Sequence, residues 1–265
     1  MNRNHRPAVS RVKRWRGQTA VGVRQRITQP LGHRLPVEIC RRAHRVRRRL
    51  WARRYTDADA FGLVEINPAR IEQSLLETAP KRPQWGRVVS GDWDQQAEPF
   101  ADRLVPRGLR QRFVEGREWR ETALFAAFVD QLSRFGNAWG HVSIEGFERR
   151  CAAIERLYQS LQQTGYRRQE QLAGTARPRL ADRVDEINVD IGRDGTLYWR
   201  CYGQHRLALA KLLDLETVPV FIHRRHRDWQ RHRDRLRTDG VSTPYESQPV
   251  DHPDLRPLTT SEANK

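Results

Sequence analysis

Apolar residues recur at helical spacing near the N-terminus, after a proline that suits the first turn of a helix. Four of them form one stripe: Ile39, Ala43, Val46 and Leu50. Their separations of three and four positions place them on one side of a helix, and arginines fill the positions between them. The pattern predicts a basic amphipathic helix over residues 36–60. Its stripe either packs on the rest of the protein or serves a binding role.

Two longer helices are predicted in the middle of the chain. Residues 118–136 carry an apolar stripe, and Gly136 is suited to end that helix. Four residues are expected to face the core: Thr122, Phe125, Val129 and Leu132. A second helix over residues 144–165 is capped by Ser143. Its inward side is expected to consist of Phe147, Ile154, Leu157, Tyr158 and Leu161.

The second half of the chain alternates in the manner of strands. Every second residue of 187–191 is apolar, which predicts a half-buried strand. Asp194–Gly195 is a strong hairpin signal, and residues 197–202 return as the second strand. Gly203 then opens a helix, and residues 218–222 form a last strand.

Other segments show shorter patterns. Residues 63–76 are predicted to begin as a strand that ends at Asn67–Pro68 and to continue as a helix. Val88–Val89 fits a short strand, and residues 167–184 read as a polar linker. A charged helix follows the last strand, and the chain after Asp239 is rich in proline and reads as a loose tail.

Charge is distributed unevenly along the 265 residues. Residues 1–54 hold 17 basic side chains and one acid, Glu38, whereas the remainder holds 32 basic and 31 acidic side chains. Residues 1–35 lack any sustained apolar period and are expected to be a disordered arm. The sequence therefore predicts a nearly neutral body with a basic arm, which suits nucleic acid or an anionic surface as a partner of residues 1–54.

Several classes of protein are disfavoured by composition. The chain has no apolar run long enough for a transmembrane segment, and its aromatic residues provide anchors for a core. Cys40, Cys151 and Cys201 are far apart and form no CxxC pair, which disfavours a zinc ribbon or a disulfide framework. We expect a cytoplasmic protein, although an Arg-rich N-terminus can also resemble an organelle transit peptide.

The segment with the clearest chemistry is the strand-turn-helix around Gly203. The first N–H groups of a helix lack intrahelical partners, and the helix dipole adds positive charge there. A glycine allows a ligand to approach the backbone closely, and Gln204, His205 and Arg206 follow it. Such a turn suits a phosphate, although many strand-glycine-helix turns bind nothing.

These residues resemble a known family. The stretch "INVDIGRDGTLYWRCYGQHRLALAKLLDLETVPVFI" is similar to the signature end of the ParB/sulfiredoxin-like fold, and "VEINPARI" resembles its opening strand. The resemblance covers about residues 61–228, with an insertion around 85–142, and leaves 229–265 as a charged helix and tail. It implies an α+β domain with a small mixed sheet that binds ATP or CTP, with Mg²⁺ as a further expected cofactor.

The sequence also departs from individual members of that family. Gln204 stands where sulfiredoxin carries its reactive cysteine, so thiol chemistry is not expected. One charged helix and a tail follow the last strand, where ParB proteins continue with a helix-turn-helix. Tyr202 replaces the aspartate that kinase-like members carry before the glycine, which weakens the case for phosphoryl transfer.

Three acids are candidates for catalysis. Asp92 and Asp94 flank Trp93 in a turn, where they could hold Mg²⁺, act as a base, or cap the turn. Glu65 lies on the opening strand, where the family resemblance places an acid near the substrate. The basic run 223–227 could meet a phosphate, or it could be the solvated start of a helix.

Two functions follow from these features. The first is a nucleotide-binding domain, either without turnover or as an Mg-dependent NTPase or small-molecule kinase. The second is a non-enzymatic scaffold that its basic arm attaches to nucleic acid or an anionic surface.

Overall fold

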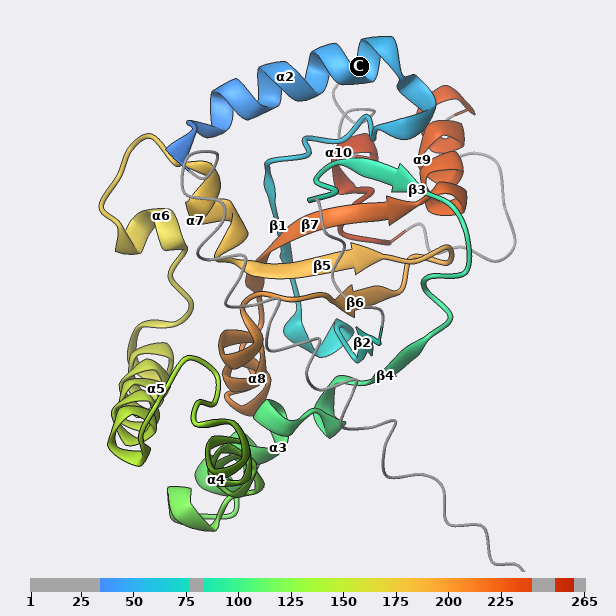
Figure 1. Cartoon of the computed structure of the whole chain (residues 1–265). Coiled ribbons are helices and arrows are strands. Elements are labelled where there is room, and N and C mark those ends of the chain that lie inside the picture. Colours follow the sequence, from blue (N-terminus) through green and yellow to red (C-terminus); the bar gives the residue numbers. More distant parts are fainter. Residues whose placement is uncertain (1–33, 77–82, 240–250, 260–265) are drawn as a thin grey trace, which may run out of the picture.

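The computed structural model describes residues 34–76, 83–239 and 251–259, so nearly all of the arm predicted for residues 1–35 lies outside the described residues. Its helices surround one sheet (Figure 1) and are α2 (Val37–Leu50), α3 (Leu104–Phe113), α4 (Ala123–Phe135), α5 (Ile144–Thr164), α6 (Gln169–Leu172), α7 (Leu180–Val184), α8 (Gln204–Leu212), α9 (Arg227–Asp239) and α10 (Arg256–Thr259). The strands are β1 (Leu63–Ile66), β2 (Gln73–Leu75), β3 (Arg87–Val89), β4 (Ala97–Pro99), β5 (Ile187–Ile191), β6 (Leu197–Trp199) and β7 (Val218–His226).

The sheet is mixed and is organised around β7. The order is β1-β7-β5-β6-β2-β4, and β3 pairs with the far end of β7. β7 runs parallel to β5 and antiparallel to β1, whereas β5 and β6 form the predicted antiparallel hairpin. A parallel pair needs a crossover connection, and here β6 and α8 supply it between β5 and β7. The expected α+β class with a mixed sheet is therefore confirmed.

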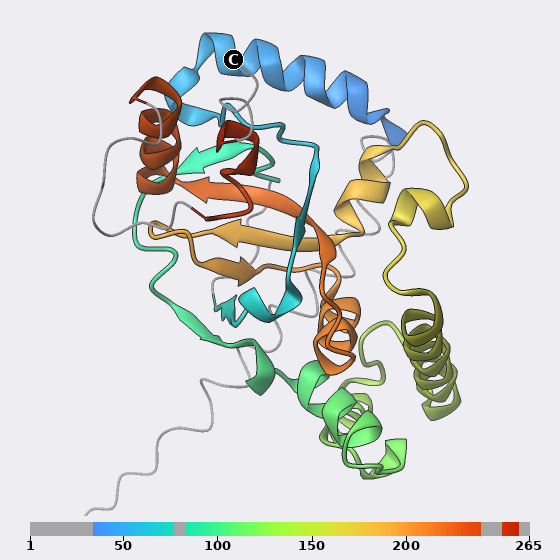
Figure 2. The ribbon, with the colours of Figure 1, turned by 180° about the vertical axis from the view of Figure 1, so that it is seen from behind.

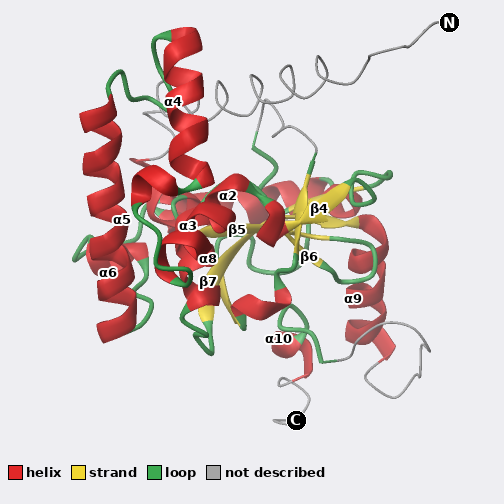
Figure 3. Ribbon diagram, turned by 90° about the horizontal axis from the view of Figure 1, so that it is seen from below, coloured by secondary structure: helices red, strands yellow, loops and turns green. Residues whose placement is uncertain are grey.

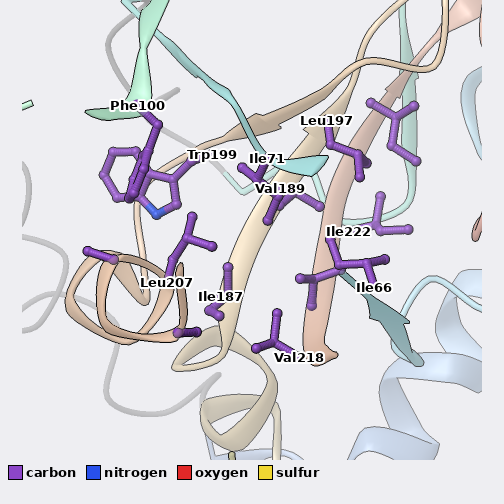
Figure 4. Close-up of a cluster of buried hydrophobic side chains, with 14 of the residues drawn as sticks. Ile66, Ile71, Phe100, Ile187, Val189, Leu197, Trp199, Leu207, Val218 and Ile222 are labelled. Atoms are coloured by element: carbon purple, nitrogen blue, oxygen red, sulfur yellow. The ribbon is translucent and has the colours of Figure 1, made fainter. Parts of the chain in front are cut away.

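The main core lies between the sheet and α8. Figure 4 shows the side chains that meet there, all of them almost without solvent exposure: Ile187 and Val189 from β5, Val218 and Ile222 from β7, and Leu207 from α8. Asn188 and Asp190, which alternate with these residues along β5, are buried as well. The strand is therefore buried on both faces rather than half-buried, and it is an inner strand of the mixed sheet.

Helices α3, α4 and α5 gather at the end of the sheet where α8 lies (Figures 1 and 3). Thr122 caps α4, and Gly136 ends it in the left-handed conformation, as predicted. Ser143 caps α5 as predicted, and Phe147 stacks on Phe128 of α4 with ring centroids 4.0 Å apart. The expected stripe of α4 is partly wrong, because Val129 is 38% exposed while its neighbours on the other side of the helix pack against α5.

The apolar stripe of the basic helix does not dock on the body. α2 begins after Pro36 as predicted, but it packs on the protein through Val37, Cys40 and His44. The stripe of Ile39, Ala43, Val46 and Leu50 points elsewhere, and its three large side chains are exposed. Figures 1 and 2 show α2 along one outer side of the molecule, with no described helix or strand beyond it.

The helix predicted after Asn67–Pro68 is replaced by a strand. Only a single 3-10 turn, Pro68–Arg70, follows β1. The next residues form β2, which pairs with β6 on one side and β4 on the other. The long-range partners thus override the local helical spacing, because the free edge of β6 offers backbone hydrogen bonds that a helix would leave unmade.

The linker and the tail contain more structure than their composition indicates. Residues 167–184 include the short helices α6 and α7. Beyond residue 250, Asp254 is buried and accepts hydrogen bonds from Arg225 and from the Trp229 indole. Arg233 also pairs with Asp254, so the described part of the tail is anchored to β7 and α9. The expectation of a loose tail is wrong for residues 251–259.

Candidate functional site

Gly203 fixes where α8 begins. Its φ of 72° is left-handed, and a Cβ on it would lie 2.6 Å from the Cα of Ile187. The first intrahelical bond runs from Leu207 N–H to the Gly203 carbonyl. No described residue accepts from the N–H groups of Gln204, His205 or Arg206. Helix α8 thus presents three free donors at its N-terminus, as the sequence predicted.

Arg206 is held in place by a buried carboxylate. Its Nη1 donates to Glu186 at 3.3 Å and to the Tyr166 hydroxyl at 3.1 Å. Glu186 also accepts from the Tyr166 hydroxyl and from the backbone N–H of Gln169, each at 2.7 Å. Burial raises the pKa of Glu186, against the opposing effect of these hydrogen bonds and of Arg206.

The guanidinium of Arg206 retains donors. Both of its hydrogen bonds use Nη1, and no described residue accepts from Nε or Nη2. The side chain is 16% exposed, and its guanidinium carbon lies 6.0 Å from the ring centroid of Tyr166. Pairs of parallel guanidinium N–H groups suit carboxylate and phosphate oxygens.

His205 contributes no charge at neutral pH. Burial lowers the pKa of its imidazole to about 3, and the positive charges of Arg150 and Arg206 add to this effect. The imidazole is therefore neutral over the physiological range. Of the predicted binding residues 203–206, the backbone N–H groups and Arg206 supply the positive potential, and His205 can only donate or accept a neutral hydrogen bond.

Glu65 lies on the same side of the protein as this turn. Its carboxylate accepts from Arg168 at 2.6 Å. Arg168 is followed by Gln169, the first residue of α6, whose backbone N–H donates to Glu186. The start of α6 therefore connects the Glu65–Arg168 ion pair with the Glu186–Arg206 ion pair. The sequence offered no signal for this link, because Arg168 belongs to the stretch read as a linker.

Asp92 and Asp94 are engaged by one arginine of the β5–β6 hairpin. Arg193 Nη2 lies 2.8 Å from a carboxylate oxygen of each. Asp94, which is almost fully buried, also accepts from the Arg193 backbone N–H at 2.8 Å. Although burial opposes ionisation, these bonds hold the pKa of Asp94 below its usual value. Carboxylates whose oxygens are occupied by a guanidinium do not suit Mg²⁺, so this pair does not fit the expected metal site.

The structure does not bring the two sets of predicted residues together. Gly203 packs on Ile187 at the start of β5, whereas Asp94 lies against Gly192 just beyond its end. Five residues of extended strand span about 16 Å. The turn and the Asp92–Asp94 pair therefore lie at opposite ends of β5, and one phosphate cannot contact both.

The basic run after residue 222 belongs to β7 rather than to a solvated helix. His223 and Arg224 both pair with Asp190 of β5, at 3.1 and 2.8 Å. The guanidinium of Arg224 also lies 3.9 Å from the ring centroid of Trp93. Burial disfavours the ionised form of Asp190, but Arg200, His223 and Arg224 hold its pKa at about 2. Sequence analysis missed Asp190, for which the polar alternation along β5 was the available signal.

Two residues near the turn have structural roles. Trp199 is buried against Phe100, with ring centroids 5.8 Å apart, and its indole N–H donates to the Tyr202 carbonyl. Burial raises the pKa of the Cys201 thiol to about 12, which keeps it protonated and unreactive. These observations indicate packing as the role of Trp199.

No family model, curated protein or solved structure matches this chain. Within the described residues, no group of three or more histidines, cysteines and acids is arranged to hold a metal ion. None of the described helices has the length and apolar character needed to cross a bilayer.

Proposed function

We propose that the chain binds a nucleotide through the turn at Gly203–Arg206. The observation that carries this proposal is the juxtaposition of three free N–H groups at the start of α8 with an Arg206 guanidinium that is fixed through one nitrogen and offers two others. Both features favour an anion with several oxygens. The similarity of the turn to the phosphate-binding turn of the ParB/sulfiredoxin-like family supports a nucleoside triphosphate, ATP or CTP, over a simple carboxylate.

In this proposal Glu186 acts as a positioning residue for Arg206. A buried carboxylate on one side of the guanidinium fixes its orientation before the ligand arrives, which reduces the ordering cost of binding. Gly203 allows the helix to start directly on β5. The ligand therefore contacts the backbone N–H groups and Arg206, and it does not contact the buried Glu186.

Turnover of the nucleotide is a further part of the proposal. Of the three acids expected to take part, Glu65 is the one linked to the turn, through Arg168 and α6. It could serve an NTPase or phosphotransferase only if its ion pair with Arg168 opens. Asp92 and Asp94 are assigned no role in this step, because they lie at the other end of β5.

Calorimetric titration of ATP and CTP, each with and without Mg²⁺, tests the proposal. A charge-assisted hydrogen bond contributes about 1.5–3 kcal/mol, so Arg206→Ala should weaken binding about 10- to 150-fold. Arg149→Ala, which removes an exposed arginine of α5, is the matched control and should leave binding unchanged. Equal affinities for wild type and Arg206→Ala, or no binding at millimolar nucleotide, would refute the assignment.

Hydrolysis is measured separately from binding. Glu65→Gln should leave nucleotide affinity within a few-fold of wild type, and it should abolish any Mg-dependent release of phosphate. If phosphate release is absent in the wild type, the chain binds its nucleotide without turnover.

A further inference from the structure

Helix α2 combines an exposed apolar stripe with exposed arginines. Ile39, Val46 and Leu50 are 50%, 56% and 64% exposed, and Trp51 directly after the helix is 50% exposed. The opposite side of α2 is already used, since Val37, Cys40 and His44 pack against the body. The stripe is therefore a second apolar surface, separate from the one that attaches the helix.

Arginines border the stripe on both sides. At 3.6 residues per turn, Arg42 and Arg49 lie along one border and Arg47 along the other, with Arg45 further out. All four side chains are exposed, and none forms an ion pair with a described residue. The two other arginines of α2 have partners within the protein. Arg41 pairs with Glu38 and Asp59, and Arg48 donates hydrogen bonds to backbone carbonyls.

We propose that α2 docks on an anionic lipid surface, with its stripe in the interfacial layer and its arginines at the headgroups. An interfacial helix requires this combination of a continuous apolar side, flanking cations and an aromatic residue at one end. The bordering arginines can bury their aliphatic stems beside the stripe while their charged ends reach the phosphates.

The stripe distinguishes a lipid surface from nucleic acid. Phosphates of a duplex would satisfy the arginines, but the aliphatic side chains between them would face a highly charged backbone without gaining burial. A bilayer surface accepts both the charged and the apolar groups. Helix α2 lies along an outer side of the molecule (Figures 1 and 2), and the large side chains of its stripe are exposed.

Co-sedimentation of the full chain with vesicles tests the proposal. The vesicles contain phosphatidylcholine with about 30% phosphatidylserine, and pure phosphatidylcholine serves as the neutral comparison. Replacing the stripe in the triple variant I39S/V46S/L50S should weaken binding at least about tenfold. Replacing the arginines in R42Q/R45Q/R47Q/R49Q should weaken binding by a larger factor, on the order of 100-fold or more, because each cation near an anionic leaflet contributes about fivefold.

Two matched controls separate the helix from general surface effects. V114S/V142S/L172S removes three equally exposed apolar side chains from other parts of the surface. R107Q/R110Q/R149Q/R156Q removes four exposed arginines from α3 and α5. Both controls should bind the vesicles within about twofold of wild type. Circular dichroism of every variant should match wild type, because the substituted side chains of α2 make no part of the core.

Three results would overturn the proposal. The first is a stripe variant that binds the vesicles as tightly as wild type, or a wild type that does not bind them. The second is a stripe variant that turns a dimer into a monomer in sedimentation velocity without vesicles, which would make a second copy the occupant. The third is tight binding of duplex DNA that falls with the stripe variant while vesicle binding is absent.

Discussion

The backbone of Gly203 lies directly on the first residue of β5. A Cβ at this position would be 2.6 Å from the Cα of Ile187 and 2.9 Å from its backbone nitrogen. Because both atoms belong to the backbone of a central strand, no side-chain rotation can make room. The requirement for glycine at the turn is therefore already set by packing, before any ligand is considered.

Gly203→Ala should lower the free energy of unfolding by at least about 2 kcal/mol, since it adds this contact to the cost of a left-handed conformation. Urea unfolding measures the change. Gly174 is a matched control, because its φ is also positive but no atom lies within 4 Å of an added Cβ. Gly174→Ala should cost only about 1 kcal/mol. Equal losses in the two variants would mean that the contact with Ile187 contributes nothing.

Stability should depend on pH through Glu186. Burial raises its pKa above the ordinary value of 4.5, which the unfolded chain retains. At a pH between the pKa of the unfolded chain and the higher pKa of the folded protein, Glu186 is protonated in the folded protein but ionised in the unfolded chain. The free energy of unfolding therefore falls as the pH rises through this window. Glu186→Gln should remove that fall.

The measurement is urea unfolding of wild type and Glu186→Gln at a series of pH values. Glu216→Gln, which changes an exposed glutamate, should retain the pH dependence of wild type. If Glu186→Gln shows the same slope as wild type, another group is responsible for the dependence.

Asp92 and Asp94 should differ strongly in their effect on stability, although both pair with Arg193. Asp94 is 3% exposed and accepts several hydrogen bonds, whereas Asp92 is 76% exposed. Asp94→Ala should cost about 2–3 kcal/mol, and Asp92→Ala should cost less than about 1 kcal/mol. Thermal and urea unfolding of the two variants provide the comparison. A larger loss for Asp92→Ala would contradict this account of the turn.

The acid dependence of Asp94 has the opposite sign to that of Glu186. The pKa of Asp94 in the folded protein lies below the ordinary value of 3.8. Its contribution to the free energy of unfolding is therefore complete above pH 3.8 and is lost as the pH falls through the folded-state pKa. Asp94→Ala should therefore be least harmful in strong acid. A loss that is independent of pH would count against the pair with Arg193.

Asp254 should be essential to the stability of the C-terminal half. Arg225 and Arg233 are each 2% exposed, and both rely on this carboxylate. Asp254→Ala leaves the buried Arg225 guanidinium without its counter-ion, whereas Arg233 keeps its pair with Asp57, and should cost about 3–5 kcal/mol. Asp251→Ala, at an exposed position of the same segment, should be nearly neutral. An Asp254→Ala variant as stable as wild type would contradict this role of the carboxylate.

Elements whose signals are local could be predicted from the amino-acid sequence alone. Spacing and capping residues placed α5 between Ser143 and Gly165, and alternation with a turn dipeptide located the β5–β6 hairpin. The turn at Gly203 was predictable for the same reason, because a glycine between a strand and an apolar helix is a local feature. Periodicity and capping act over a few residues, so they can be recognised without knowledge of the fold.

Which charged and apolar groups face solvent depends on contacts between distant segments. From the sequence, Arg224 and Arg225 could meet a phosphate or be solvated, yet Asp190 and Asp254 from distant segments compensate them inside the protein. From the sequence, the stripe of α2 could pack on the protein or serve a binding role. Val37, Cys40 and His44 on another side of the helix make the contact with the body, and the stripe does not. Contacts between distant segments also connect Glu65, through Arg168, with the residues around the Gly203 turn, whereas Asp94 lies at the other end of β5. Burial of a charge or an apolar side chain depends on partners from other helices and strands, and these partners cannot be identified from the neighbouring residues in the sequence.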